Sequence, residues 1–482
     1  MKKYILISCI IVLFTSSCSD DFLHTQPETS IPESIAFSTP QKILAQTNNL
    51  YKQLQNQSFY GGRFIIFNEQ RADQFGQNDG NAATGSAVWN QNVASTNDFV
   101  NNVWSVGYTA INACNILISK LDGTTVISND LAKNYIAEAK FIRAFCYFSL
   151  VQTYARPYNQ DNHALGLPLR LTPITTSGNN DLARSSVEMV YNQILKDLDE
   201  AEAYLPVSYP TPLLNASRVK KCTAIALKTR VLLVQNNFER VITESKKIVS
   251  ETLPFHYTEE GITQKLETSF STIFGGSYIG TEAIFSVIFA NSTTETPSAQ
   301  YSLAYNYLKQ PIIFLAASGI VSDPALTSNA DARSGLIGTS AANQKVLKKF
   351  SVTTAPFRDY VPVIRYSEIL LNYAEAAANM NDLAKATSLL KAVRNRSNPD
   401  FEFQANDIAT KELLVAAIQK ERDIEFLGEG LRLMDLQRKV QTLPAKEGSI
   451  GIAPLVLPAS SNYIWPIPSG EISVNKLIEP NA

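Results

Sequence analysis

Few side chains in this sequence have the types and spacing that enzyme chemistry requires. The chain contains three histidines, His24, His163 and His256, and none of them stands in an H-E-x-x-H arrangement. A Ser-His-Asp triad would have to use His163 or His256, and neither has a recognisable setting. The motifs G-x-S-x-G, G-x-x-x-x-G-K-[ST] and G-x-G-x-x-G do not occur. The sequence therefore predicts neither these hydrolase sites nor a nucleotide-binding loop.

The carboxylates of residues 411–439 are the other set that chemistry might use. Glu421, Glu425 and Glu429 recur at intervals of four, with arginines between them. A glycosidase needs two carboxylates about 5–9.5 Å apart on opposite sides of a sugar, and neighbours on one helix face flank nothing. Acids at this spacing instead pair with arginines. We predict an ion-pair network here and no catalytic residues, with Arg143, inside an apolar helix, as one candidate partner.

Binding chemistry is better represented. Residues 56–99 are rich in Gly, Asn and Gln and are predicted to form a long loop region. Aromatic rings can stack on the apolar faces of sugars, while amides and carboxylates bond their hydroxyls. The candidate ligand-binding residues are Asp73, Gln74, Asn78, Trp89 and Asn92, with Tyr301 and Tyr305 as a second group. The alternative is that each aromatic side chain only anchors its own loop to the scaffold.

Composition argues against several other classes of protein. With 42 basic and 44 acidic residues the net charge is −2, and no basic patch suggests a nucleic-acid partner. Cys114, Cys146 and Cys222 lie inside apolar helical patterns and form no C-x-x-C pair. They are interpreted as small buried apolar residues, so we predict no disulfide framework, no metal site and no cofactor.

The N-terminus has the pattern of a targeting segment. Lys2 and Lys3 precede a short apolar run, and the small residues 15–17 lead to Cys18. This resembles a bacterial lipobox, which predicts a signal peptide over residues 1–17 and a lipid on Cys18. The alternative is an ordinary cleaved signal followed by an incidental cysteine. Residues 18–33 are polar and contain two prolines, as expected for a tether.

Periodicity predicts a mostly α-helical fold. Residues 131–154 contain no Gly or Pro and are apolar nearly all round, which indicates a helix buried by other helices. Helix–turn–helix pairs at 218–249 and 366–394 have the form of tetratricopeptide-like units. One domain is predicted over residues 34–482. Its helical scaffold is expected at about 34–55, 100–250 and 362–440, a loop-rich binding part with a few short strands at 56–99 and 251–361, and a C-terminal wrap at 441–482.

Several segments together resemble the SusD/RagB family of Bacteroidetes outer-membrane lipoproteins. They occur in family order over essentially the whole chain. They include CSDD at 18–21, AFSTPQK at 36–42, AEAKFIRAFCYFSLVQTY at 137–154, GLPLRL at 166–171, RSSVEMVYNQILKDLDEAEAYLP at 184–206, RYSEILLNYAEAA at 365–377, ERDIEFLGEGLRLMDLQR at 421–438 and YIWPIPSGEISVN at 463–475.

The resemblance implies a function as well as a fold. A member of this family is a surface-exposed lipoprotein that captures a nutrient, usually an oligosaccharide, without catalysis. It passes that nutrient to a SusC-like TonB-dependent outer-membrane transporter. The matching segments are scaffold segments and do not identify the ligand. Capture of peptides or another non-glycan nutrient, a surface hydrolase, and a scaffold for other surface proteins are the alternatives.

Overall fold

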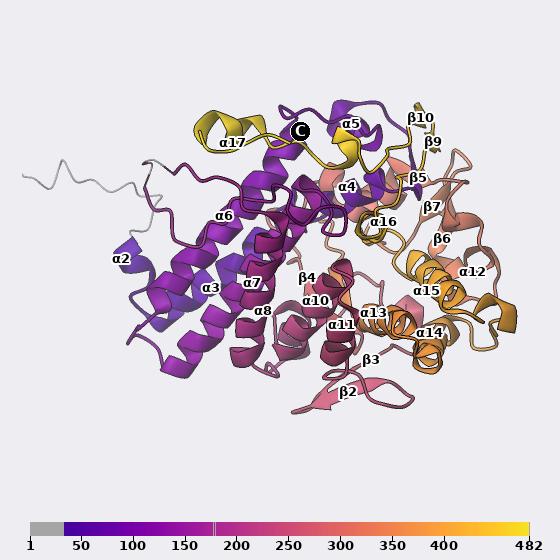
Figure 1. Cartoon of the computed structure of the whole chain (residues 1–482), viewed down its shortest axis with the longest axis horizontal. Coiled ribbons are helices and arrows are strands. Elements are labelled where there is room, and N and C mark those ends of the chain that lie inside the picture. The colour runs from indigo at the N-terminus through magenta and orange to yellow at the C-terminus, as the bar shows by residue number, and fades with distance from the viewer. Residues whose placement is uncertain (1–32, 177, 179, 482) are drawn as a thin grey trace, which may run out of the picture.

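A long buried helix is the centre of the fold. The computed structural model describes residues 33–176, 178 and 180–481, so the predicted signal peptide and Cys18 lie outside the described residues. Helix α7 (Asn129–Tyr154) begins at Ser128, whose hydroxyl accepts from Leu131 N. It packs between α6 (Asp98–Leu121) and α8 (Val187–Tyr204) (Figure 1). Most of its residues are buried, as its apolar surface on all sides predicted.

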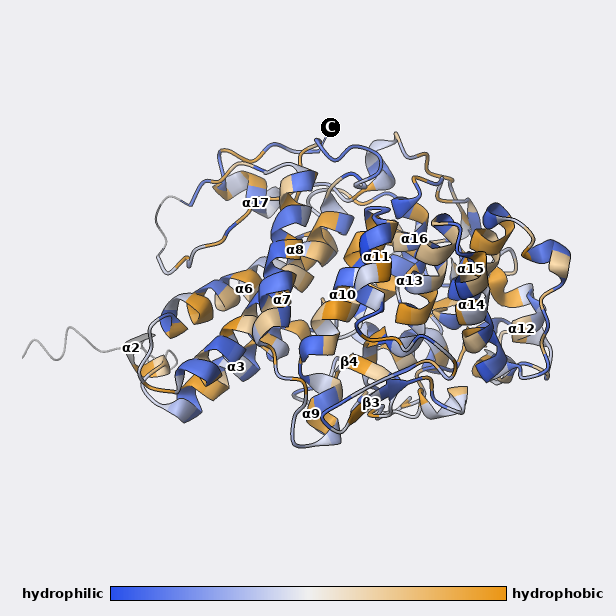
Figure 2. Ribbon diagram, turned by 60° about the horizontal axis from the view of Figure 1, so that its bottom comes forward, coloured by the Kyte–Doolittle hydropathy of each residue, from blue (hydrophilic) through white to orange (hydrophobic). Residues whose placement is uncertain are grey.

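Paired helices continue the scaffold from α7. They are α10 (Lys221–Val234), α11 (Phe238–Ser245), α13 (Tyr366–Asn379), α14 (Leu383–Ser397), α15 (Lys411–Glu425) and α16 (Arg432–Arg438). In Figure 2 the helices α10, α11, α13, α14 and α15 follow one another across the molecule, each in contact with the next, while α16 contacts α10 and α4 (Arg63–Arg71). The turns of both predicted pairs contain an asparagine at positive φ, Asn236 and Asn381. The residue after each, Asn237 or Asp382, caps the next helix. The two predicted helix pairs are therefore confirmed.

The remaining helices lie near the two chain ends and in the connections. They are α2 (Glu33–Ala36), α3 (Pro40–Leu54), α4 (Arg63–Arg71), α5 (Ser86–Trp89), α9 (Pro212–Ser217), α12 (Pro324–Thr327) and α17 (Ser469–Val474). The C-terminal segment runs back over α6 and the end of α7 (Figure 1). Trp465 N donates to Thr153 O of α7 at 2.8 Å, and Ser469 N donates to Ser95 O, just before α6, at 2.9 Å. Among the described helices, none combines the length and the hydropathy needed to cross a membrane.

Strands contribute only short antiparallel pairs in the described part of the chain. The pairs are β1 (Phe75–Gln77) with β5 (Ile313–Leu315), β2 (His256–Glu259) with β3 (Ile262–Lys265), β4 (Ala283–Val287) with β8 (Val361–Arg365), β6 (Ile337–Thr339) with β7 (Lys345–Leu347), and β9 (Lys446–Gly448) with β10 (Gly451–Ala453). β4 and the strands β5 to β7 lie within the part at 251–361 where short strands were expected. The mostly helical fold with a few short strands is confirmed.

Two predictions about local structure were wrong. Residues 56–99 are not a long loop, because they contain α4, β1 and α5. The Asn- and Gly-rich composition dominated that prediction, although the run RFIIFNEQR in α4 is buried on almost every side. The helix expected at 411–439 is broken after Glu425. Gly428 and Gly430 there adopt φ values of 80° and 79°, which favour glycine and cannot continue a right-handed helix.

Candidate functional site

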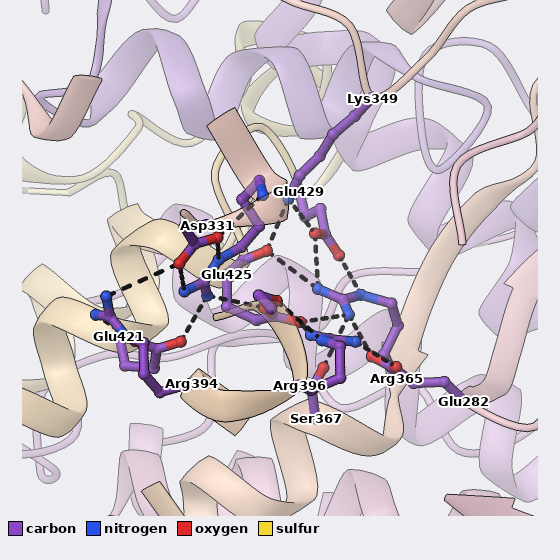
Figure 3. A network of polar contacts seen from close by, with 12 residues as sticks. Glu282, Asp331, Lys349, Arg365, Ser367, Arg394, Arg396, Glu421, Glu425 and Glu429 are labelled. Atoms are coloured by element: carbon purple, nitrogen blue, oxygen red, sulfur yellow. Dashed lines mark hydrogen bonds and ion pairs between the residues drawn. The ribbon is translucent and has the colours of Figure 1, made fainter. Parts of the chain in front are cut away.

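The carboxylates that might have suggested catalysis belong to a buried ion-pair network (Figure 3). Glu421 and Glu425 are 0% exposed. Glu421 bonds Arg333 and Arg394 at 2.5 Å each, and Glu425 bonds Arg396 at 2.6 Å and Arg365 at 2.8 Å. Paired and enclosed in this way, they do not flank a substrate. The predicted ion-pair network is confirmed for these residues.

The network combines five cations with five carboxylates. They are Arg333, Lys349, Arg365, Arg394 and Arg396, with Glu282, Asp331, Glu421, Glu425 and Glu429. The charges balance, so no charge of the network is buried without a partner of opposite sign. Arg143 is not part of this network. Its guanidinium bonds Asp197 of α8 at 2.6 and 2.8 Å and Asn115 of α6 at 2.8 Å. An acidic partner was predicted correctly, but residues 421–429 do not supply it.

Trp89 lies in the core and not in the exposed loop that its predicted ligand-binding role assumed. Its side chain is 0% exposed, and its Nε1 donates to Phe75 O at 2.8 Å. A ring enclosed in this way offers no face for a sugar. The asparagines beside it in the sequence suggested an exposed loop, whereas the short helix α5 directs the indole inward against β1.

Asp73 and Gln74 are also used by the scaffold. Asp73 accepts two bonds from Arg432, at 2.7 and 2.9 Å. Burial opposes its ionisation, but the bonds and charge of Arg432 lower the pKa of the Asp73 carboxyl overall. Buried Gln74 accepts from Ile320 N at 2.6 Å and donates to Asp73 at 2.9 Å. These two side chains hold β1 to its surroundings and have little capacity left for a ligand.

The two asparagines of this first group lie at different places. Asn78 is half-buried directly after β1, where its amide donates to Pro311 O and to Gln344 Oε1 at 2.8 Å each. Asn92 is exposed after α5. The structure therefore does not bring the five residues of the first group together around one ligand. Neither their role nor that of the second group in binding is tested by these contacts alone.

Tyr301 and Tyr305 remain partly exposed on two short helical turns, Ala299–Tyr301 and Tyr305–Lys309. Buried Arg63 holds the first turn in place through hydrogen bonds. Its guanidinium donates to Gln300 O and to Ala83 O at 2.8 Å each and lies 5.8 Å from the Tyr301 ring centre. Tyr305 turns to its own segment, and its hydroxyl donates to Gln310 Oε1 at 2.5 Å.

A polar groove beside Tyr301 is the candidate site. Its volume is about 790 Å³, within the range of about 300–1,000 Å³ typical of ligand sites. It lies between the end of α3, the exposed side of α6 and the loop 293–298. Amide and hydroxyl side chains dominate its lining: Gln53, Gln55, Asn56, Gln57, Ser58, Asn102, Ser105, Thr293, Thr294, Thr296 and Ser298, with Lys52 and Glu295 as the charged residues.

Sequence reasoning found one residue of this groove and missed the others. Tyr301 lines it, while Tyr305 and the five residues of the first group do not. The hydroxyl-rich run STTETPS at 292–298 carried a signal that was available in the sequence. The amides of α3 and α6 carried none, because exposed Asn and Gln on a helix are common without any function.

A buried lysine near Trp89 makes the stability of this region sensitive to pH. Lys446 donates to Gln70 O at 2.5 Å and to Ala72 O at 2.7 Å, and its Nζ lies 5.8 Å from the Trp89 ring centre. Burial lowers the pKa of the Lys446 ammonium to about 7, against the charge of Asp73 and with a further lowering from Arg71. Because the pKa in the unfolded chain is about 10.4, the penalty for the buried charge is full below pH 7 and disappears as the pH rises towards 10.

We therefore expect wild-type protein to gain free energy of unfolding between pH 7 and pH 9, relative to a Lys446→Met variant, by roughly 1–2 kcal/mol. Urea unfolding at the two pH values measures the difference. The exposed Lys345→Met variant is the matched control and should show the same gain as wild type. If Lys446→Met and wild type respond equally to pH, the buried ammonium is not the source of the effect.

Comparisons with known proteins agree with one another. A family model described as "SusD family" matches residues 341–482, and one described as "Starch-binding associating with outer membrane" matches residues 21–233. The structure of a SusD superfamily protein from Bacteroides fragilis is 30% identical, with a TM-score of 0.82, over 92% of this chain and 100% of that one.

Two more distant proteins are also similar. SusD-like protein P25 of Formosa agariphila is 23% identical over 260 residues, which are 52% of this chain and 47% of that relative. The chain therefore matches about half the length of P25. A structure named as a laminarin-binding SusD-like protein is 21% identical, with a TM-score of 0.69, over 92% of this chain and 99% of that one, and it shows the shared fold.

Proposed function

Since this chain belongs to the SusD family, we propose that it is a binding protein that captures a glycan in the polar groove beside Tyr301. The observation that carries the proposal is the groove itself. One partly exposed aromatic ring stands at the edge of a wide surface of amides and hydroxyls. A sugar presents apolar C–H faces and hydroxyl edges, and this combination complements both.

The location and onward delivery of the glycan belong to the same proposal. The matched model description names association with the outer membrane, which supports a position there. We propose that a lipid on Cys18 anchors the protein at the cell surface and that a SusC-like TonB-dependent transporter receives the captured glycan. The buried pairing of Glu421 and Glu425 supports a non-catalytic role, because these carboxylates cannot reach a substrate.

Tyr301→Ala is expected to weaken glycan binding about twofold to tenfold, because the ring supplies about 0.5–1.5 kcal/mol of stacking. Titration calorimetry on protein lacking residues 1–18 measures it, with starch and laminarin as the first two of a panel of plant, algal and microbial glycans. Tyr204→Ala, at an exposed tyrosine of α8, is the matched control and should bind as wild type does.

Two outcomes would contradict the proposal. Unchanged affinity in Tyr301→Ala would remove the groove as the binding site. Release of new reducing ends from a bound glycan would show that the protein is catalytic.

A further inference from the structure

The polar groove does not end at α3 but continues into a second, smaller hollow. Lys52, Gln55 and Glu295 line both spaces, so the two adjoin along one wall. Asn48, Lys52 and Gln55 follow at intervals of four and three and therefore lie on one face of α3. The second hollow has a volume of about 270 Å³ and is bounded beyond α3 by α9 and β4.

The lining of this hollow changes from polar to apolar. Its apolar residues are Tyr51, Leu54, Leu214, Phe285, Val287 and Ile288. Asn48, Lys52 and Glu295 are exposed at the solvent side of the hollow, and the polar side chains deeper in its wall are mostly paired. Gln55 Nε2 donates to Ile288 O at 2.8 Å, and Arg218 donates to Glu138 at 2.7 and 3.0 Å. A sugar hydroxyl placed here would lose its water with few new partners, which costs about 1–3 kcal/mol per group. The hollow therefore disfavours an unsubstituted sugar ring.

One polar atom in the wall lacks a partner. Ser286 lines the hollow and is 1% exposed, and its Oγ makes no hydrogen bond to any described residue. Buried hydroxyls almost always have a partner. The Ser286 hydroxyl is enclosed, so a rotation about its Cα–Cβ bond would present it to an acceptor oxygen on a group that enters the hollow. The hollow thus matches a group that is mainly apolar and carries one acceptor, as an ester does.

We propose that the ligand is a glycan bearing an acyl or aryl ester, with its sugar in the polar groove and the ester substituent in the hollow between α3, α9 and β4. This inference rests on the proposed function and adds the class of glycan to it. The sizes agree with the assignment. A volume of about 270 Å³ lies just below the range of about 300–1,000 Å³ that holds a whole ligand. The hollow is therefore large enough for a substituent, and the larger groove is large enough for the sugar that carries this substituent.

Matched glycans test the proposal directly. Acetylated xylan, acetylated glucomannan and feruloylated arabinoxylan are each compared with the same polymer after alkaline removal of the esters. Starch and laminarin are included as ester-free glucans. We expect wild-type protein to bind at least one esterified polymer about tenfold or more tightly than its de-esterified form, because burying an apolar substituent contributes about 25 cal/mol per Å² of surface.

Variants that fill the hollow separate its contribution to glycan affinity from the contribution of the groove. Leu214→Trp, at a half-buried position, should reduce affinity for the esterified glycan to that of the de-esterified one. Leu213→Trp is the matched control, since Leu213 is 40% exposed on the same helix and does not line the hollow. Ser217→Leu, one turn along α9, fills the same space and serves as a second variant if Leu214→Trp does not fold.

The outcomes distinguish this inference from the proposed function. Equal affinity for both members of every pair, or full affinity in both filling variants, overturns the ester assignment. If the glycan then still depends on Tyr301, the proposed function stands. Binding of starch or laminarin alone, without any effect of the filling variants, also overturns the ester assignment. Failure to bind any glycan in the panel counts against both.

Discussion

Glu425→Gln is expected to lower the free energy of unfolding by about 3–5 kcal/mol. The Glu425 carboxylate bonds Arg365 at 2.8 Å, Arg396 at 2.6 Å and Arg333 at 3.2 Å, and it is 0% exposed. The substitution leaves five cations facing four carboxylates in a buried space. An isosteric amide keeps the shape, so the loss would come from charge and not from packing.

The pH dependence of this difference is an additional test. Burial disfavours the charged carboxylate, but Arg396, Arg365 and Arg333 outweigh burial and hold the pKa of Glu425 well below its usual range. The stabilisation is therefore fully present above about pH 4.3, the ordinary glutamate value, and decreases as the pH falls. Wild type and Glu425→Gln should become more alike on acidification.

Denaturant unfolding of the two proteins at neutral pH measures the effect. Glu402→Gln is the control, because Glu402 pairs with Lys391 at 2.8 Å on the surface, where it is 72% exposed. Exposed pairs of this kind contribute about 0–1 kcal/mol, so little change is expected. If Glu425→Gln unfolds at the same denaturant concentration as wild type, the buried network does not stabilise the fold in the way described.

Arg143→Met is expected to cost about 3–5 kcal/mol for a related reason. The guanidinium joins α6, α7 and α8 through Asn115 and Asp197, and both charged side chains of the pair are enclosed. Removing Arg143 leaves the Asp197 carboxylate buried without its cation. Burial already raises the pKa of Asp197, and Arg143 is the main group that opposes this rise. The variant should therefore lose most stability at neutral and higher pH.

A double variant separates the contribution of the Arg143–Asp197 charges to stability from the contribution of their packing. Arg143→Met with Asp197→Leu removes both charges and keeps similar volume, and such replacements of buried ion pairs are often neutral. We expect it to regain most of the stability that Arg143→Met loses in urea unfolding. A double variant no more stable than Arg143→Met would show that the loss came from packing and not from the unpaired carboxylate.

Local pattern was sufficient to predict the scaffold. Helix α7 follows from 24 residues without Gly or Pro and an apolar surface on all sides. The helix pairs follow from periodic runs separated by short Asn- and Asp-containing turns. Such signals involve residues within one or two turns of each other, so they survive in the sequence without knowledge of the fold. The need of Arg143 for an acidic partner could be predicted in the same way, since it depends only on burial.

The identity of partners required the tertiary structure. Asp197 is 54 residues from Arg143, and nothing at either position indicates the other. The asparagines beside Trp89 predicted an exposed loop. In the structure its indole lies in the core and donates a hydrogen bond to the carbonyl of Phe75 in β1. In both cases the decisive contact depends on how distant elements pack, which short-range periodicity does not record.

The candidate site also combines one feature that the sequence predicted with others that only the tertiary structure revealed. Tyr301 could be selected from the sequence because a tyrosine in a polar segment is unusual enough to notice. The groove beside it exists only because the end of α3, the exposed side of α6 and the loop 293–298 meet in space. Each contributes ordinary surface amides and hydroxyls whose types carry no signal of their own. The sequence shows which single residues could contact a sugar. The concave surface on which a ligand could bind forms only when segments distant in the sequence pack together.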